Sequence, residues 1–276
     1  MLSIGNPGIG DYYIEFMKNI FRLSNGKAPV VCVSHAGHVT PPANVATPST
    51  SSVTRVNDYL SLKGQVQHKL AYINEHIGPN VRLTLVGHSI GCYMILQLLT
   101  MLNEARIFKC LLLFPTIERI AASPQGKVTT PVLHYLRWMA PLIIYPLSYL
   151  IPDTIKLYLV KKYFDSNEFP LCAIEGTLKL LSPSAVMNIL YLANIEMQTV
   201  VEADHQLIET HLRKLSFYYG ASDHWCPRSY HDDMKKRFPE ADIYLCSAGH
   251  EHAFVLKNSV EMADIVWRLL KGSSMD

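Results

Sequence analysis

The sequence has little charge of either sign. Charged residues make up 17% of the 276 residues, the formal net charge is +2, and no run of basic residues interleaved with aromatic ones occurs. A nucleic-acid-binding surface needs such a concentration of positive charge, so we expect no nucleic acid partner. Hydrophobic residues make up 49% of the chain, which is enough for one large core, and nothing in the composition marks a second domain.

The sequence also lacks the usual marks of a secreted protein. It contains no Asn-x-Ser/Thr acceptor, and its first residues have no charged segment followed by an apolar core. Its cysteines are widely separated, and several fall within apolar runs, where a reduced cysteine behaves as a small core residue. We therefore predict a reducing compartment and six unpaired cysteines: Cys32, Cys92, Cys110, Cys172, Cys226 and Cys246.

Apolar runs typical of strands alternate with runs typical of helices. The pattern predicts strands at residues 30–33, 81–86, 108–114, 214–220 and 241–246, and helices at 62–77, 92–102, 228–238 and 258–270. Such alternation gives an α/β fold in which a mostly parallel sheet is flanked by helices on both faces. Residues 40–52 are rich in Pro, Ser and Thr, which predicts a mobile loop.

Residues 87–91 spell Gly-x-Ser-x-Gly between a predicted strand and a predicted helix. A sharp strand-to-helix turn forces its central serine into a strained backbone conformation, and glycine on each side lets the chain segments approach one another. The pattern predicts that Ser89 is a catalytic nucleophile whose hydroxyl projects above the sheet. The alternative is a glycine-rich turn whose serine only caps the helix.

A serine nucleophile needs a histidine base and a carboxylate. In the fold that contains this type of turn, the three residues follow along the chain in the order Ser, acid, His. Asp223 follows the predicted strand at 214–220 and is the candidate acid, with Glu118 as its rival. His252 is the candidate base because His-Ala-Phe opens the run into the last helix. The rival base, His250, lies farther out in the same loop.

A tetrahedral oxyanion needs two backbone N–H donors, one from the residue after the nucleophile and one from an early loop. Ile90 supplies the first. The second maps to residues 5–8, Gly-Asn-Pro-Gly, and since Pro7 has no N–H we assign it to Asn6. An ordinary Asn-Pro-Gly turn is the alternative.

Six ordered segments together resemble the lipid droplet-associated hydrolases, an α/β-hydrolase family, and the resemblance runs from Gly5 to the last helix. The segments are residues 5–8, 34–38, 87–91, 113–119, 217–227 and 252–254. The resemblance implies a triad of Ser89, Asp223 and His252, and weak activity on sterol or other lipid esters. It also implies a location at the surface of lipid droplets and of the endoplasmic reticulum, on their cytosolic face.

The start of the chain departs from the family pattern. Such hydrolases have two or three strands before the oxyanion loop, whereas four residues precede Gly5 here. We therefore expect the first strands of the fold to be missing and the adjacent strand to be an unpaired edge.

The alternation of strands and helices breaks over residues 118–213, which predicts a helical lid inserted between two parts of the hydrolase core, 1–117 and 214–276. Within the lid, residues 131–152 are strongly apolar and carry Arg137 as their one formal charge. Pro141 and Pro146 would break a membrane-spanning helix, so we predict two short helical pieces that dip into one leaflet or a lipid monolayer. The alternative is a cap that is buried on its own sheet.

The aromatic and aliphatic side chains of this segment suit a lipid interface. Lys156, Lys161 and Lys162 follow it and would meet anionic headgroups. The residues that we expect to contact lipid are Trp138, Ile143, Ile144 and Leu147.

These observations predict a serine hydrolase of lipid esters that works through an acyl-enzyme and requires no metal or organic cofactor. His35 and His38 have a metal-like spacing, but no further ligands accompany them, so local hydrogen bonds are expected instead. Two alternatives stay open: a vestigial hydrolase that acts as a lipid droplet-associated protein, and an acyltransferase that uses the same Ser89. The sequence leaves the oligomeric state open.

Overall fold

A single parallel sheet forms the centre of the computed structural model, which describes residues 1–39, 59–164, 169–246 and 248–272. All neighbouring strands of this sheet are parallel, and their order is β2-β1-β3-β4-β5-β6. The strands are β1 (Leu2–Ser3), β2 (Cys32–Val33), β3 (Leu83–His88), β4 (Ile107–Leu113), β5 (Leu215–Gly220) and β6 (Asp242–Cys246). The α/β class and the parallel sheet are thus confirmed. The loop predicted at 40–52 lies outside the described residues.

Strand β1 lies inside the sheet, where it pairs with β2 on one side and with β3 on the other. The edge of the described sheet on this side is therefore β2, with only two residues. A strand this short offers few unpaired backbone groups to another chain. All six cysteines are free.

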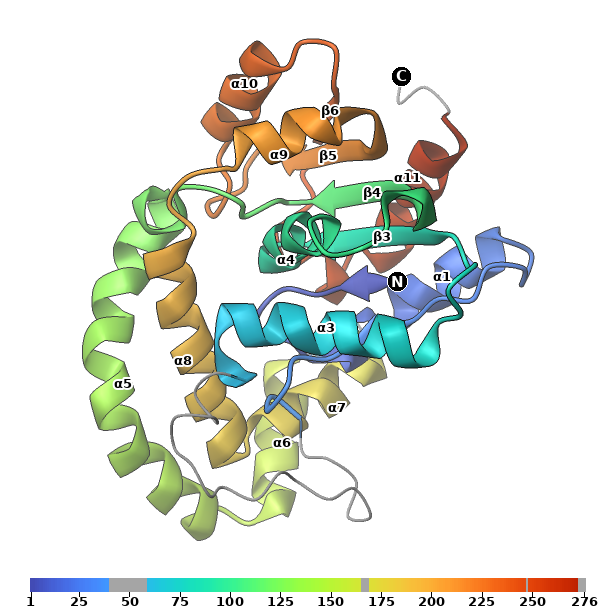
Figure 1. The fold of residues 1–276 in the computed structure, drawn as a ribbon. Helices are drawn as coiled ribbons and strands as arrows, with labels where there is room; N and C mark the ends of the chain where they lie inside the picture. Colours follow the sequence, from blue (N-terminus) through green and yellow to red (C-terminus); the bar gives the residue numbers. More distant parts are fainter. Residues whose placement is uncertain (40–58, 165–168, 247, 273–276) are drawn as a thin grey trace.

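Helices cover both faces of the sheet (Figure 1). Helices α3 (Leu62–His76) and α4 (Ile90–Leu99) contact each other on one face, and α1 (Ile14–Leu23) contacts α11 (Ser259–Lys271) on the other. Helix α10 (Arg228–Arg237) connects β5 to β6. The elements predicted from the sequence occur with bounds that differ by at most three residues, whereas β1, α1 and the short helix η1 (Gly10–Tyr13) were not predicted.

The described part of the chain between β4 and β5, where we predict the lid, contains five α-helices. In Figure 1, α5 forms an outer arc and α8, with which it packs, lies on its inner side. The five are α5 (Pro124–Leu150), α6 (Asp153–Tyr163), α7 (Leu171–Leu180), α8 (Pro183–Thr199) and α9 (His205–Thr210).

The prediction of two short helical pieces within residues 131–152 is wrong. Helix α5 is continuous through Pro131, Pro141 and Pro146 and ends only at Leu150. An internal proline removes one backbone hydrogen bond and crowds the preceding turn, and a helix can accommodate this by bending. The arc of α5 in Figure 1 is such a bend, and the chain turns only at Pro152 before α6.

Candidate active site

Ser89 lies in a tight turn between β3, which ends at His88, and α4, which begins at Ile90. Its φ of 54° and ψ of −127° are strained for a residue with a side chain. A Cβ at Gly87 would lie 2.8 Å from the Cα of Cys92, and one at Gly91 would lie 2.0 Å from the carbonyl oxygen of Ser3. Both glycines of the motif are therefore required because backbone segments touch there.

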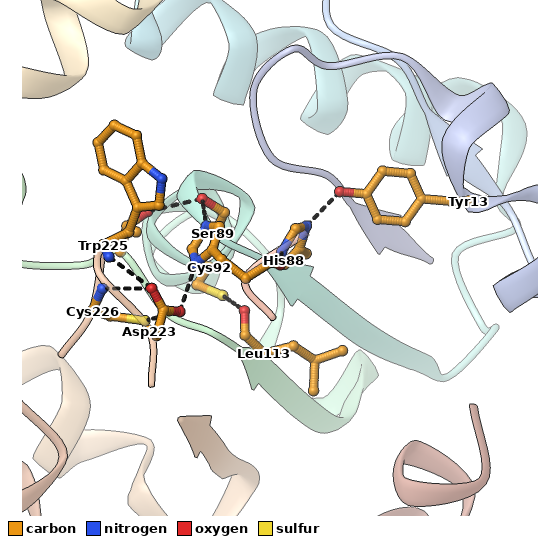
Figure 2. A network of polar contacts seen from close by, with 10 residues as sticks. Tyr13, His88, Ser89, Cys92, Leu113, Asp223, Trp225 and Cys226 are labelled. Carbon is orange, nitrogen blue, oxygen red and sulfur yellow. Dashed lines mark hydrogen bonds and ion pairs between the residues drawn. The ribbon is translucent and has the colours of Figure 1, made fainter. Parts of the chain in front are cut away.

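The structure joins Ser89, His252 and Asp223 in a chain of hydrogen bonds. Figure 2 labels the two ends of this chain, Ser89 and Asp223. The Oγ of Ser89 lies 2.9 Å from Nε2 of His252, and Nδ1 of His252 lies 2.6 Å from Oδ2 of Asp223. Because Nδ1–H donates to the carboxylate, Nε2 is free to accept the hydroxyl proton of Ser89. The three residues come from the turn after β3, the loop after β5 and the loop after β6.

Asp223 is prepared to stay ionised. Burial by itself raises the pKa of its carboxyl. The hydrogen bond and charge of His252, together with the hydrogen bonds from the Cys226 thiol and the Trp225 N–H, lower this pKa by more than burial raises it, so the pKa lies below its ordinary value. Oδ1 accepts from the backbone N–H of Trp225 at 2.7 Å, and Oδ2 accepts from Sγ of Cys226 at 3.0 Å. These donors fix the carboxylate in position for His252 (Figure 2).

The donor atoms of Asp223, Cys226 and His252 lie within 4.8 Å of one another, a spacing that a metal ion could use. However, the Asp223 carboxylate and Nδ1 of His252 are hydrogen-bonded to each other, so these two atoms already have partners. Burial raises the pKa of the Cys226 thiol well above its ordinary value, whereas a metal ligand must be a thiolate. We therefore propose no metal ion at this cluster.

The rival acid and base take other partners. Nδ1 of His250 contacts Sγ of Cys246 at 3.5 Å. Glu118 forms an ion pair of 3.0 Å with Arg119, which also pairs with Asp233 at 2.8 Å. The geometry thus favours His252 and Asp223 as the partners of the serine.

Residues 5–8, the proposed oxyanion loop, lie directly against Ser89, since a Cβ at Gly5 would be 2.8 Å from the Cβ of Ser89. The Asn6 side chain turns away toward α8, where Nδ2 donates to the carbonyl of Ile189 and to Oε1 of Glu196, both at 3.2 Å. Within the described part of the chain, the backbone N–H groups of Asn6 and Ile90 have no protein acceptor. Both groups are therefore free to bind an oxyanion, as we propose.

His35 and His38 hold the oxyanion loop through local hydrogen bonds. The His35 N–H donates to the carbonyl of Gly8, and Nδ1 of His38 donates to that of Pro7, both at 2.7 Å. Nδ1 of His35 accepts from the buried Nζ of Lys69 at 3.0 Å. Burial lowers the pKa of both imidazoles, that of His38 to about 4, so both stay neutral.

Two residues without a role in the sequence interpretation connect the loops of the site. The buried His88 donates from Nε2 to the carbonyl of His252 at 2.8 Å, and its Nδ1 accepts from the Tyr13 hydroxyl at 2.5 Å (Figure 2). The Tyr13 oxygen accepts in turn from the N–H of Gly5 at 3.2 Å. Burial lowers the pKa of His88 to about 3, so this neutral ring ties together the oxyanion loop, the serine turn and the His252 loop.

Solved structures that share this arrangement of sheet and helices are α/β hydrolases. One of them, an esterase from Exiguobacterium antarcticum, is 15% identical with a TM-score of 0.62, over 98% of this chain and 91% of that one. An identity this low is evidence for the fold alone. The chain therefore has the α/β-hydrolase fold.

Within that class, the chain belongs to the lipid droplet-associated hydrolase family, whose model matches residues 1–255. The lipid droplet-associated hydrolase of Gallus gallus is 42% identical over 269 residues, which cover 96% of this chain and 82% of that protein. The one of Homo sapiens is 40% identical over 278 residues, with 97% and 82% covered. The predicted family is confirmed, and together with the fold it supports a hydrolase that acts on lipids.

The two histidines of the last loop should differ sharply in their contribution. Replacing His252 by Ala should lower kcat for p-nitrophenyl butyrate by about 10³-fold or more, as the loss of a triad member does. Replacing His250 by Ala should cost far less, because its ring contacts Cys246 instead of Ser89. Circular dichroism would check that both variants fold, and the reverse order of losses would move the base to His250.

Glu196 should make stability depend on pH. Burial raises the pKa of its carboxyl to about 8, so it is protonated and neutral at pH 7. A carboxyl whose pKa is higher in the folded than in the unfolded chain binds more protons when folded, so its contribution to stability is complete below the ordinary pKa of 4.5 and is lost as the pH rises toward 8. The loss is at most about 1.4 kcal/mol per pH unit.

Urea unfolding between pH 4.5 and 8 would measure this effect. The unfolding free energy of the wild type should fall with rising pH relative to that of Glu196→Gln, which cannot ionise. Glu175→Gln, an exposed change on α7, should follow the wild type throughout. Parallel curves for the wild type and Glu196→Gln would refute the assignment.

Proposed function

We propose that the chain is a serine hydrolase of lipid esters that works at the surface of lipid droplets. The main support for this proposal is the chain of hydrogen bonds from Ser89 through His252 to Asp223, because this arrangement activates a serine hydroxyl. Membership of a family named for lipid droplets supports the lipid substrate. Sterol esters are one candidate substrate.

In the first half of the reaction, His252 Nε2 takes the Ser89 proton while Oγ bonds to the ester carbonyl carbon. The negative charge that develops on the carbonyl oxygen is stabilised by the N–H groups of Ile90 and Asn6, and Asp223 stabilises the imidazolium. The bond to the alcohol then breaks, and the alcohol leaves with the proton from His252.

In the second half, His252 takes a proton from water, whose oxygen bonds to the acyl carbon. The bond to Ser89 breaks, Ser89 regains its proton from His252, and the fatty acid leaves. Every proton passes through one imidazole, so no metal or organic cofactor is needed in this scheme.

The outer surface of the lid is apolar. Large side chains on α5 and α6 are exposed, among them Leu142 at 76%, Tyr149 at 86% and Leu150 at 76%. Exposed apolar clusters of this kind mark surfaces that bind lipid or protein. We call this surface the apolar face; it comprises Tyr135, Met139, Leu142, Ile143, Tyr145, Leu147, Tyr149, Leu150, Ile155, Tyr158, Leu159 and Tyr163.

We propose that the apolar face rests in the lipid monolayer of the droplet, or in the cytosolic leaflet of the endoplasmic reticulum. The exposure of these side chains favours lipid contact over a cap buried on its own sheet. Among the described residues, no single helix is both long and apolar enough to cross a membrane; the helices α7 and α8, bent by 90° at their junction, satisfy the length and composition criteria only as a pair.

We propose a changed set of lipid-contacting residues, based on which of the predicted side chains are exposed. Ile143 and Leu147 are exposed, and Leu147 also lines a cavity inside the lid, as does the half-buried Ile144. The side chain of Trp138 lies outside the described part of the chain. The ammonium group of Lys156 donates to the carbonyl of Ser148 and to the carboxylate of Asp153, so its charge is already paired within the protein. Of the three lysines, we therefore assign the exposed Lys161 and Lys162 to the headgroups at the lipid surface.

The nucleophile can be tested with a fluorophosphonate probe. Wild-type protein should be labelled on Ser89 and should hydrolyse lipid esters, and Ser89→Ala should abolish both while the protein stays folded, because alanine is no larger than serine. Labelling of Ser89→Ala at the wild-type level would refute the assignment. Absence of labelling in the wild type would indicate a vestigial site, and acyl transfer to an added alcohol without hydrolysis would indicate an acyltransferase.

The apolar face can be tested by flotation of the full chain with phospholipid-coated triolein droplets. Changing Leu142, Tyr149 and Leu150 to Asp should weaken binding at least about tenfold, since each loses its apolar burial in lipid. As a control, three exposed apolar residues elsewhere, Val81, Met101 and Val260, are changed to Asp and should leave binding unchanged. If the variant with Asp at 142, 149 and 150 is folded and floats as well as the wild type, the proposal that the apolar face binds lipid is refuted.

A further inference from the structure

Two cavities lie on either side of the junction between the hydrolase core and the lid. The catalytic cavity, which we name for His252 in its wall, measures about 210 Å³. The loop of residues 5–8, Tyr12, Tyr13 and His88 also line it, whereas Ser89 is not among its lining residues. The lid cavity, of about 360 Å³, lies among α5, α6, α7 and α8 and is almost wholly apolar. Its lining includes Ile144, Leu147, Leu159, Val160, Tyr163 and Val186.

Phe164 lines both cavities. It follows directly after α6, is 6% exposed, and packs with Val160 and Ile174 in a small hydrophobic core separate from the main one. The cavities adjoin at a second point, where the hydroxyls of Tyr12 and Thr177 lie 2.7 Å apart, since Tyr12 lines the catalytic cavity and Thr177 the lid cavity. Phe164 thus belongs to the walls of both cavities, and the Tyr12–Thr177 hydrogen bond joins their linings.

The sizes of the cavities indicate what they hold. Sites that enclose a small molecule usually measure roughly 300–1,000 Å³, so the catalytic cavity alone is too small for a long-chain lipid ester. The lid cavity is large enough for the remainder, and its lining suits an aliphatic chain, which makes no hydrogen bonds.

The lid cavity also adjoins the lipid surface that we propose. Leu147, Leu159 and Tyr163 line the cavity and belong to the exposed apolar face. An acyl chain that enters the lid cavity from the lipid phase therefore stays in contact with apolar side chains.

We propose that the lid cavity binds the acyl chain of long-chain lipid esters, and that Phe164 separates it from the catalytic cavity, so that displacement of the ring joins the two. The proposal rests on the proposed function in one respect, namely that Ser89 is the nucleophile. Phe164 is then a residue that determines chain-length specificity. It takes no part in the proton transfers.

The test compares kcat/KM for p-nitrophenyl palmitate with that for p-nitrophenyl butyrate. Phe164→Ala should raise the palmitate-to-butyrate ratio by about fivefold or more, because it opens the passage, and Val186→Trp should lower it by a similar factor, because it fills the lid cavity. Val128→Trp, an equally large change at an exposed position of α5 outside the cavity, should leave the ratio unchanged. Ratios that stay at the wild-type value in both cavity variants would overturn the proposal.

A binding measurement separates this proposal from the proposed function. Ser89→Ala protein should bind the fluorescent fatty acid cis-parinaric acid, and adding Val186→Trp should weaken that binding about tenfold, whereas adding Val128→Trp should not. If the wild type hydrolyses neither ester and no probe labels Ser89, the proposed function fails, and the binding result alone decides the cavity assignment. Equal binding by the cavity variant and its control would refute it, and circular dichroism would verify that each variant is folded.

Discussion

The candidate site depends on one close contact, between the chain at the end of β1 and the turn that carries Ser89. The carbonyl of Ser3 lies where a side chain at Gly91 would be, and Ser89 lies where a side chain at Gly5 would be. Since the Ser3 carbonyl meets the backbone at Gly91 and the Cβ of Ser89 meets the backbone at Gly5, the first turn of α4 and the start of the proposed oxyanion loop come together at Ser89. The N-terminus of α4 carries a partial positive charge, which would favour an oxyanion at this place. The strain in Ser89 is sustained by this packing.

The three residues of the candidate triad could be brought together from the sequence because each follows a strand of a parallel sheet, and the carboxyl ends of parallel strands meet at one edge. Their order along the chain then assigns their roles. The network of Tyr13 and His88 gave no comparable signal, because it joins residues 75 positions apart through side-chain hydrogen bonds. Strand β1 was missed because two residues are too few to show alternation. Helix α1 did carry a usable pattern, since its buried residues Phe16 and Ile20 are four positions apart.

The lid shows where sequence patterns stop being informative. An apolar segment with prolines has the same composition whether it is buried as a cap or exposed to lipid, and whether its prolines end the helix or bend it. Those alternatives depend on what packs against the segment. In this protein α8 covers the inner side of α5, and a row of aliphatic and aromatic side chains on α5 and α6 is left exposed. Tertiary packing therefore determines both the continuity of α5 and the side chains available to lipid.

Hydrogen bonds join helix α8 of the predicted lid to the loop that we propose for the oxyanion. Helix α8 accepts two hydrogen bonds from the Asn6 side chain, through the carbonyl of Ile189 and the buried carboxyl of Glu196. Asn188 of the same helix donates to the carbonyl of Gly37 at 2.7 Å, near the histidines that hold the oxyanion loop. Moving α8 away from the core would break these bonds and disturb the loop from which Asn6 would donate its N–H. Contacts therefore run from α5, through α8, to the loop beside Ser89, so the position of this loop depends on the packing of α8 in the lid.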